Sequence, residues 1–213
     1  MLTAWLIRHG ESLANTGHAT ADPTSIELTP QGYDQAQQIA QFFDLAPTLI
    51  VTSPYLRTQA TAVPTMERFP HVPQVEWAVQ EFTYLSPPRY RNTSIEDRRP
   101  AAQSYWINGD PYAIDGEGAE SFADFIGRVQ QLKSRIAAEE TGLVAIFTHE
   151  TFIQALLWTI LTGVTDLDAK QMLKFRIFSG SFSIPNGALV RLEFRSTDIW
   201  TSGIETTHLS WFG

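Results

Sequence analysis

The 213-residue sequence contains no cysteine, which excludes disulfide bonds, thiolate nucleophiles and cysteine-ligated zinc sites. Basic residues are scarce too: 15 lysines and arginines stand against 23 aspartates and glutamates, for a formal net charge of −8. Such a chain lacks the extended basic face that nonspecific binding to nucleic acids or anionic membranes requires. Any site for an anion must therefore be a local cluster of arginine and histidine.

Long apolar runs are also missing. No stretch of 18 consecutive apolar residues occurs, so we expect no membrane-spanning helix. The N-terminus lacks the basic segment and long apolar core of a signal peptide, and we expect a cytoplasmic protein. The length and the 43% hydrophobic content fit a single domain over residues 1–213, with an insertion at about 83–118.

Short apolar runs alternate with amphipathic stretches along the chain. Buried strands are expected at residues 2–7, 49–52 and 143–148, with a further strand at 75–79. Helices are expected at residues 30–43, 56–69, 120–140, 151–161 and 167–178. The alternation predicts an α/β fold, a three-layer α/β/α sandwich with a mostly parallel central sheet.

Local signals refine these elements. Thr29 and Pro30 suit the N-cap and first position of the helix at 30–43. Pro64 should kink or split the helix at 56–69. Residues 183–194 are typical of a terminal hairpin that turns at an Asn-Gly pair. The apolar face of the helix at 30–43 is expected to comprise Tyr33, Ala36, Ile39, Ala40 and Phe43.

The segment 83–118 has no hydrophobic periodicity and contains several prolines and arginines. We interpret it as an inserted lid with at most one short helix, because a structureless loop of that length is uncommon unless it is functional.

Three strand-to-helix junctions carry arginine or histidine. Arg8 and His9 end the first strand, Arg57 follows the second, and His149 ends the strand at 143–148. Because parallel strands end at one edge of the sheet, these four side chains can converge. Gly10 permits the turn and close approach that this needs. Arginine matches phosphate oxygens with a planar fork of donors, and neutral histidine can carry a covalent intermediate.

The remaining three histidines (His18, His71 and His208) lie in expected loops or the tail, and we expect them to be surface side chains. An Arg-His-Gly tripeptide alone would equally fit a buried polar pair that merely ends a strand.

Five segments nevertheless resemble the histidine phosphatase superfamily, which contains the cofactor-dependent phosphoglycerate mutases. They are LIRHGESLAN, LTPQGYDQAQQIAQFF, VTSPYLRTQATA, GAESFADFIGRV and VAIFTHE, in the family's order over nearly the whole chain. The resemblance implies a phosphoglycerate mutase-like fold and a phosphohistidine on His9. Arg8, Arg57 and His149 would hold the phosphoryl oxygens.

The resemblance assigns further roles. Glu81 matches the family's proton donor, which protonates the leaving oxygen and later activates water; this requires a raised pKa. Asn15 would add a donor to the phosphate, and Ser12 would contact it too. One position departs from the family, which usually has glycine where this chain has Glu150. A carboxylate there favours the helix dipole, but beside the phosphate site it would repel the substrate unless it points away. It could also recognise a cationic or hydroxyl-bearing leaving group.

The resemblance favours an acid phosphatase-type enzyme acting on small phosphorylated substrates without metal or cofactor. The segment FTYLSPPRY after Glu81 differs from the Tyr-Gly segment of the mutases. Mutase chemistry stays open, since Arg98 and Arg99 correspond to paired arginines that grip the substrate carboxylate in mutases. A non-catalytic phospholigand-binding protein and a metallohydrolase are further alternatives, although no short metal-binding motif is present. A homodimer is compatible with the sequence, which does not specify the oligomeric state.

Overall fold

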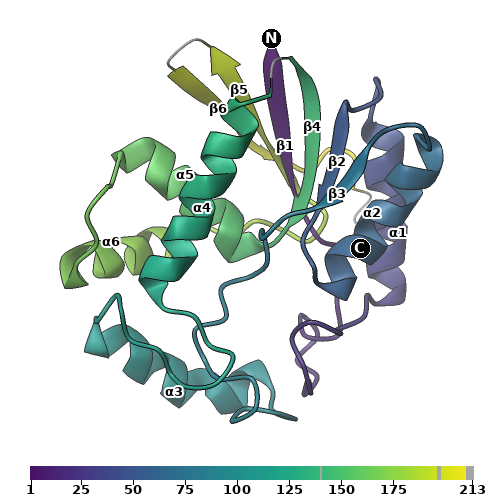
Figure 1. Ribbon diagram of the computed structural model, residues 1–213. Helices are drawn as coiled ribbons and strands as arrows, with labels where there is room; N and C mark the ends of the chain where they lie inside the picture. Colours follow the sequence, from purple (N-terminus) through teal and green to yellow (C-terminus); the bar gives the residue numbers. More distant parts are fainter. Residues whose placement is uncertain (140, 196–197, 210–213) are drawn as a thin grey trace.

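The computed structural model describes residues 1–139, 141–195 and 198–209. Its six-stranded sheet has the order β3-β2-β4-β1-β5-β6 (Figure 1). The strands are β1 (Leu2–Arg8), β2 (Leu49–Thr52), β3 (Gln74–Glu76), β4 (Gly142–Thr148), β5 (Leu189–Arg195) and β6 (Asp198–Glu205). Strands β3, β2, β4 and β1 run parallel, whereas β5 pairs antiparallel with both β1 and β6. The predicted α/β fold with a mostly parallel sheet is therefore confirmed.

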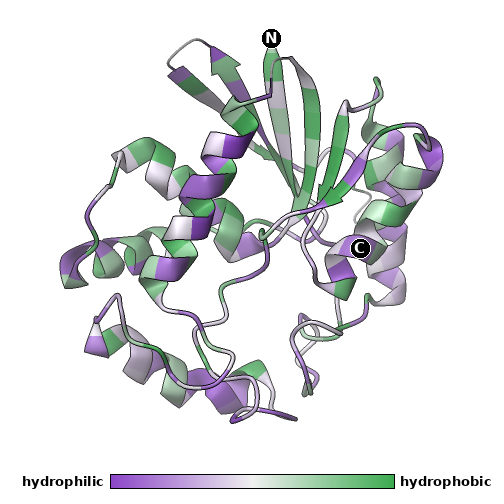
Figure 2. Ribbon diagram, viewed as in Figure 1, coloured by the Kyte–Doolittle hydropathy of each residue, from purple (hydrophilic) through white to green (hydrophobic). Residues whose placement is uncertain are grey.

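Helices cover both faces of the sheet (Figure 1). They are α1 (Pro30–Phe42), α2 (Leu56–Arg68), α3 (Ile95–Asn108), α4 (Phe122–Ala137), α5 (Glu150–Thr162) and α6 (Ala169–Gly180). Side chains of β1 alternate between two apolar clusters: Leu6 packs with α4 and α5, and Ile7 packs with α1 and α2. Because both faces are covered, β1 and β4 are hydrophobic along most of their length (Figure 2).

Several local predictions are wrong. Helix α2 continues through Pro64, so the predicted split does not occur, while the alternative of a kink at Pro64 stays a prediction. On α1, Tyr33 is exposed, because the close packing of Gly32 and the burial of Gln35 turn that helix toward the chain after His9. The third strand is only three residues long, at Gln74–Glu76, and all three are exposed.

The predicted position of the C-terminal hairpin is also wrong. Residues 183–188 form no strand; the hairpin consists of β5 and β6, and its connecting residues 196–197 lie outside the described part of the chain. The Asn186-Gly187 pair instead forms a turn before β5, with Gly187 at φ +77°.

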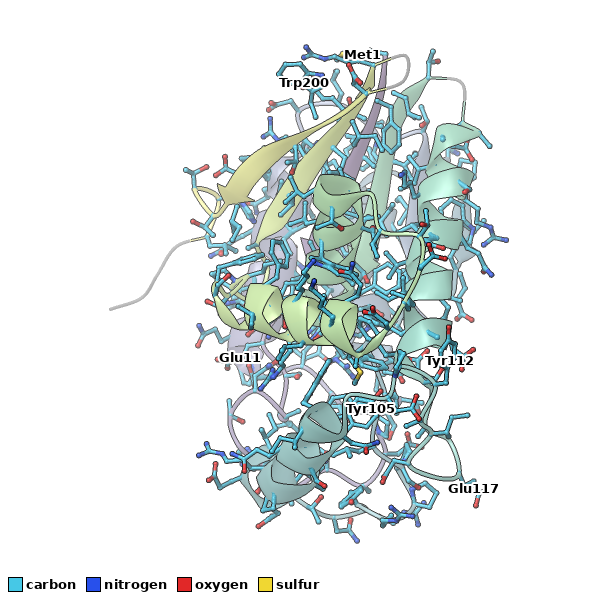
Figure 3. All side chains as sticks on the ribbon, turned by 90° about the vertical axis from the view of Figure 1, so that its left-hand side faces the viewer. Met1, Glu11, Tyr105, Tyr112, Glu117 and Trp200 are labelled. Atoms are coloured by element: carbon cyan, nitrogen blue, oxygen red, sulfur yellow. The ribbon has the colours of Figure 1, made fainter. Side chains whose placement is uncertain are left out.

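The segment 83–118 is more ordered than its composition suggests, since α3 is a helix of 14 residues. Ser94 caps it by accepting the backbone N–H of Asp97, whose carboxylate accepts the N–H of Ser94 in return. Figure 3 shows Tyr105 and Glu117 of this segment at the end of the molecule opposite Met1. The segment thus lies beyond the carboxyl end of β1.

Within the described ranges, no helix is long and apolar enough to cross a membrane.

Candidate active site

The ends of β1, β2 and β4 bring one arginine and two histidines into contact. Arg57, the second residue of α2, donates from Nε to Nε2 of His9 at 3.1 Å. Its second terminal nitrogen lies 3.1 Å from Nδ1 of His149, the N-cap residue of α5. The two imidazole rings are 5.2 Å apart, measured between centroids. One guanidinium therefore bridges both histidines.

His9 is held as a neutral imidazole with a defined tautomer. Its Nδ1 lies 2.7 Å from the carbonyl oxygen of Gly10, so Nδ1 carries the proton and donates it there. Nε2 then keeps its lone pair, directed at Arg57. Burial, followed by the positive charges of Arg57 and Arg8, lowers the pKa of His9 well below its ordinary value. A neutral Nε2 is the form that can attack an electrophile.

The glycine after His9 serves close packing. A Cβ atom at Gly10 would lie 2.4 Å from the carbonyl oxygen of Gly32 in α1, and its φ angle is not positive. Gly10 also donates its N–H to the hydroxyl of Thr61 at 3.0 Å. Position 10 therefore requires glycine because α1 packs directly against it, leaving no space for a side chain. This packing also positions the loop that carries His9.

His149 is fully buried and is fixed from its far side by Ser53. Its Nε2 lies 2.8 Å from Oγ of Ser53, whose hydroxyl also contacts Thr58 at 2.8 Å. Burial and the nearby Arg57 lower the pKa of His149 well below its ordinary value. Sequence reasoning missed Ser53, although it directly follows β2 at the edge where the site was expected.

Glu81 lies beside this cluster with a partly buried carboxyl group. Oε1 accepts the N–H of Phe82 at 3.0 Å, and Oε2 accepts the N–H of Thr151 at 3.4 Å. Burial raises the pKa of Glu81, and the Phe82 N–H and the charge of Arg57 oppose the shift. A carboxyl group with a raised pKa retains its proton at higher pH, as a proton donor must.

Arg8 and Glu150 form an ion pair at the end of β1. Nη1 of Arg8 lies 2.8 Å from Oε2 of Glu150 and also donates to the carbonyl oxygen of Ile184. The other Glu150 oxygen accepts the N–H of Ile184 at 2.9 Å. Among the described residues, Nε of Arg8 has no hydrogen-bond partner. Glu150 therefore points toward Arg8.

A cavity of about 490 Å³ opens above Arg57 and Glu81. Its walls come from the chain at 14–26, the segment 83–102 and α6. Among the described residues, those that line the cavity include one carboxylate, Glu81. The lining arginines are Arg57, Arg98, Arg99 and Arg176, and the larger apolar or aromatic side chains are Ile26, Tyr55, Phe82, Tyr84, Leu85, Tyr90 and Ile95. In a chain of net charge −8, this lining is positively charged. His9 and His149 lie behind Arg57 and do not themselves line the cavity.

The other predicted site residues divide into two groups. Arg98 and Arg99 line the cavity, and Arg99 is also paired with Glu96 at 2.7 Å on the surface. Ser12 and Asn15 do not line it; the hydroxyl of Ser12 donates to Oδ1 of Asn15 at 2.8 Å.

Sequence reasoning also missed Asn186 and Arg176. Asn186 donates to the carbonyl oxygen of His9 and to Oδ1 of Asn15, at 3.2 Å each. Arg176 reaches the cavity from α6. Neither lies at a strand end, so the pattern that indicated the other residues does not include them. His208, expected at the surface, is half-buried beside the same turn and contacts the carbonyl oxygen of Gly187.

Within the part of the chain that the structure describes, no three histidine, cysteine, aspartate or glutamate side chains gather where they could hold a metal ion.

Comparison with known families agrees with this geometry. A model of the histidine phosphatase superfamily (branch 1) matches residues 4–201. The chain belongs to the histidine phosphatase superfamily. The predicted family membership is therefore confirmed.

Relatives in this superfamily include named phosphatases. The chain is 28% identical over 186 residues to the adenosylcobalamin/alpha-ribazole phosphatase of Salmonella typhimurium, covering 84% of this chain and 87% of the relative. It is 24% identical over 181 residues to the protein of that name from Escherichia coli, with the same coverage.

Solved structures share the fold at lower identity. A putative alpha-ribazole-5'-P phosphatase from Escherichia coli superposes with a TM-score of 0.75 at 20% identity, over 96% of both chains. A phosphoserine phosphatase from Entamoeba histolytica, in complex with 3-phosphoglyceric acid, gives a TM-score of 0.73 at 21% identity, covering 99% of this chain and 100% of the other. These likenesses establish the phosphoglycerate mutase-like fold.

Proposed function

We propose that this protein is a metal-independent phosphatase that hydrolyses small phosphomonoesters through a phosphohistidine on His9. The observation that carries the proposal is the neutral Nε2 of His9, held 3.1 Å from Arg57, which lines the cavity together with Glu81. A neutral imidazole, a guanidinium and a carboxyl group with a raised pKa thus belong to one region of the molecule. The named relatives are phosphatases of the same superfamily, which supports this chemistry.

In the first half-reaction, Nε2 of His9 attacks phosphorus and the bond to the leaving oxygen breaks. Arg8, Arg57 and His149 hold the phosphoryl oxygens and stabilise the charge of the transition state. When the substrate binds, the Nε–H of Arg57 donates its hydrogen bond to a phosphoryl oxygen instead of to Nε2 of His9. The lone pair of the histidine is then free to attack. Glu81 gives its proton to the leaving oxygen.

In the second half-reaction, the Glu81 carboxylate takes a proton from water, which attacks the phosphohistidine and releases phosphate. Asn15 and Ser12 belong to the loop after His9. Since Oδ1 of Asn15 already accepts from Ser12 and Asn186, the amide nitrogen of Asn15 is the atom that would contact a phosphoryl oxygen.

The cavity indicates what kind of leaving group fits. Its aromatic wall suits an apolar or ring-containing group, and Arg98, Arg99 and Arg176 suit a further negative charge. The segment 83–118 would act as a lid over the bound substrate. Relatives named for alpha-ribazole, phosphoserine and glucosyl-3-phosphoglycerate are consistent with such substrates.

A mutase is the second candidate, because Arg98 and Arg99 do line the cavity. Such an enzyme would transfer the phosphoryl group from His9 to a second phosphoglycerate instead of water. Interconversion of phosphoglycerates with a bisphosphate primer, faster than their hydrolysis, would favour it.

The test is hydrolysis of p-nitrophenyl phosphate in the presence of EDTA. Native protein is expected to turn over, and His9→Ala to lose at least about 10⁴-fold in kcat. His71→Ala, which changes an exposed histidine, is the matched control and should keep native activity. Equal turnover by His9→Ala would remove His9 as nucleophile, and loss of native activity in EDTA would favour a metallohydrolase.

A further inference from the structure

The ion pair between Arg8 and Glu150 lies where β1 ends, next to His9 in the chain. Both side chains are largely buried, with 11% of Arg8 and 24% of Glu150 exposed. Glu150 contacts Arg8 through one oxygen and the N–H of Ile184 through the other. Nη1 of Arg8 also donates to the carbonyl oxygen of Ile184. The carboxylate thus fixes both the position of the guanidinium and the chain opposite it.

Glu150 also changes the charge that an incoming phosphate group meets. Arg57 contacts both histidines, which are neutral, and the charges of Arg57 and Arg8 both act on His9 and His149. The carboxylate of Glu150 offsets one of these two positive charges. A bound phosphate dianion would therefore compete with Glu150 for Arg8 and be repelled by the carboxylate at short range.

We infer that Glu150 is a positioning residue that acts as an internal counter-ion of Arg8 and weakens the binding of phosphate at this site. The pair holds Arg8 beside His9 when the site is empty. The repulsion acts on substrate and product alike, so it limits retention of the phosphate released by each turnover. Because it takes Arg8 as a phosphate contact, this role of Glu150 rests on the proposed function.

The variant Glu150→Gln separates the effect of the negative charge from the effect of the hydrogen bond with Ile184. The amide oxygen of glutamine can still accept the N–H of Ile184, while the negative charge is removed. Glu120→Gln is the matched control: Glu120 pairs with Arg128 at 2.7 Å with similar burial and accepts a backbone N–H, that of Thr83, but it does not line the cavity. It therefore reports on the loss of a comparable ion pair and of one net charge elsewhere.

Binding of inorganic phosphate, measured by calorimetry at low salt, is the readout. Glu150→Gln is expected to lower the dissociation constant roughly ten- to hundredfold, whereas Glu120→Gln should change it by no more than about threefold. The inhibition constant of phosphate and the KM for p-nitrophenyl phosphate should fall together in Glu150→Gln without an increase in kcat. Added salt should shrink the difference from native protein.

A Glu150→Gln variant that folds and binds phosphate no more tightly than native protein would overturn the inference. If that variant does not fold, Glu150→Asp decides, since it keeps the charge on a shorter side chain. Phosphate binding as weak as in native protein supports the counter-ion role, and tightening in the aspartate variant contradicts it. A chain that binds phosphate with these differences but never hydrolyses an ester would refute the proposed phosphatase while leaving Glu150 in its role.

Discussion

The floor and the walls of the cavity are built in different ways. The floor, defined as Arg57 and Glu81, which line the cavity, together with His9 and His149 behind Arg57, comes from strand ends and adjoining turns. Its polar atoms contact one another or the backbone. The walls, defined as the lining residues of 83–102 and α6, include half-buried or exposed side chains such as Arg98 and Arg176. Neither of these two arginines forms an ion pair with any described residue. A rigid floor suits one reaction, and open walls suit a choice of substrate.

If the floor sets the reaction, changes there should reduce kcat for every substrate. The largest effect after loss of His9 is expected for Glu81→Gln, which cannot donate a proton. We expect kcat for alkyl phosphates to fall by about 10² to 10⁴. Steady-state kinetics with a panel of esters measures this, and an unchanged kcat would show that another group protonates the leaving oxygen.

The pH profile of native protein and of Glu81→Gln gives the same residue a second test. The raised pKa of Glu81 means that the donor form is lost as pH rises through that pKa, so native activity should decline on the alkaline side and this decline should be absent in the variant. The raised folded-state pKa also means that stability is lost as pH rises through it. Glu81→Gln should therefore melt at a higher temperature than native protein at neutral pH; an equal or lower melting temperature would contradict the pKa direction.

Arg57→Lys sharpens the comparison between floor and wall. Lysine keeps the charge, but its single ammonium cannot reproduce the fork that contacts His9 and His149 together. We expect kcat to fall about 10²-fold. The wall variant Arg99→Lys should leave p-nitrophenyl phosphate hydrolysis within about threefold of native protein. A similar loss of kcat in both variants would show that floor and wall residues do not differ in their effect on the reaction.

Ser53→Ala tests whether the position of His149 depends on its hydrogen bond with Ser53. Loss of the hydroxyl leaves Nε2 of His149 without its 2.8 Å contact in a fully buried position. We expect about a tenfold lower kcat and a loss of roughly 1–3 kcal/mol in the free energy of unfolding. Kinetics and chemical denaturation measure the two effects, and native values for both would show that His149 is positioned by Arg57 alone.

The smallest expected effect is at the wall. Arg176→Gln should raise KM roughly two- to fivefold for esters whose leaving group carries a carboxylate, and leave KM for uncharged esters unchanged. The paired comparison of phenyl phosphate with a carboxylated phenyl phosphate measures this. An equal change for both esters would mean that Arg176 acts on the phosphate end.

The difference between floor and walls also explains which residues of the site could be predicted from the sequence. The apolar runs of β1, β2 and β4 have the length and spacing of buried strands, so these three parallel strands and the residues at their carboxyl ends followed from local pattern. The bounds of β3 and the pairing of β5 with β6 did not. His9 and His149 could be brought together because a parallel sheet leaves little choice about where such residues meet. The fold and the family are confirmed, while the chemical roles of the site residues stay predictions.

Of the wall residues, the family resemblance indicated Arg98 and Arg99, which do line the cavity. Other contacts of the site could not be predicted, because their residues meet only through tertiary packing. Arg176 reaches the cavity from a helix whose sequence shows no marked apolar face, and Asn186 reaches His9 across 177 positions of the chain. The direction of Glu150 depends on Arg8 and Ile184, which no local pattern links. The capping-box residues Ser94 and Asp97 could have indicated the start of α3 from the sequence, but an interpretation based on the composition of the segment overlooked them.

Trapping the intermediate tests the central claim most directly. Native protein mixed rapidly with p-nitrophenyl phosphate, quenched under alkaline conditions that preserve phosphohistidine, and digested for mass spectrometry should carry one phosphoryl group on His9. His9→Ala should carry none. A native enzyme that turns over at full rate without any phosphoryl group on His9, or with one on another residue, would contradict the account.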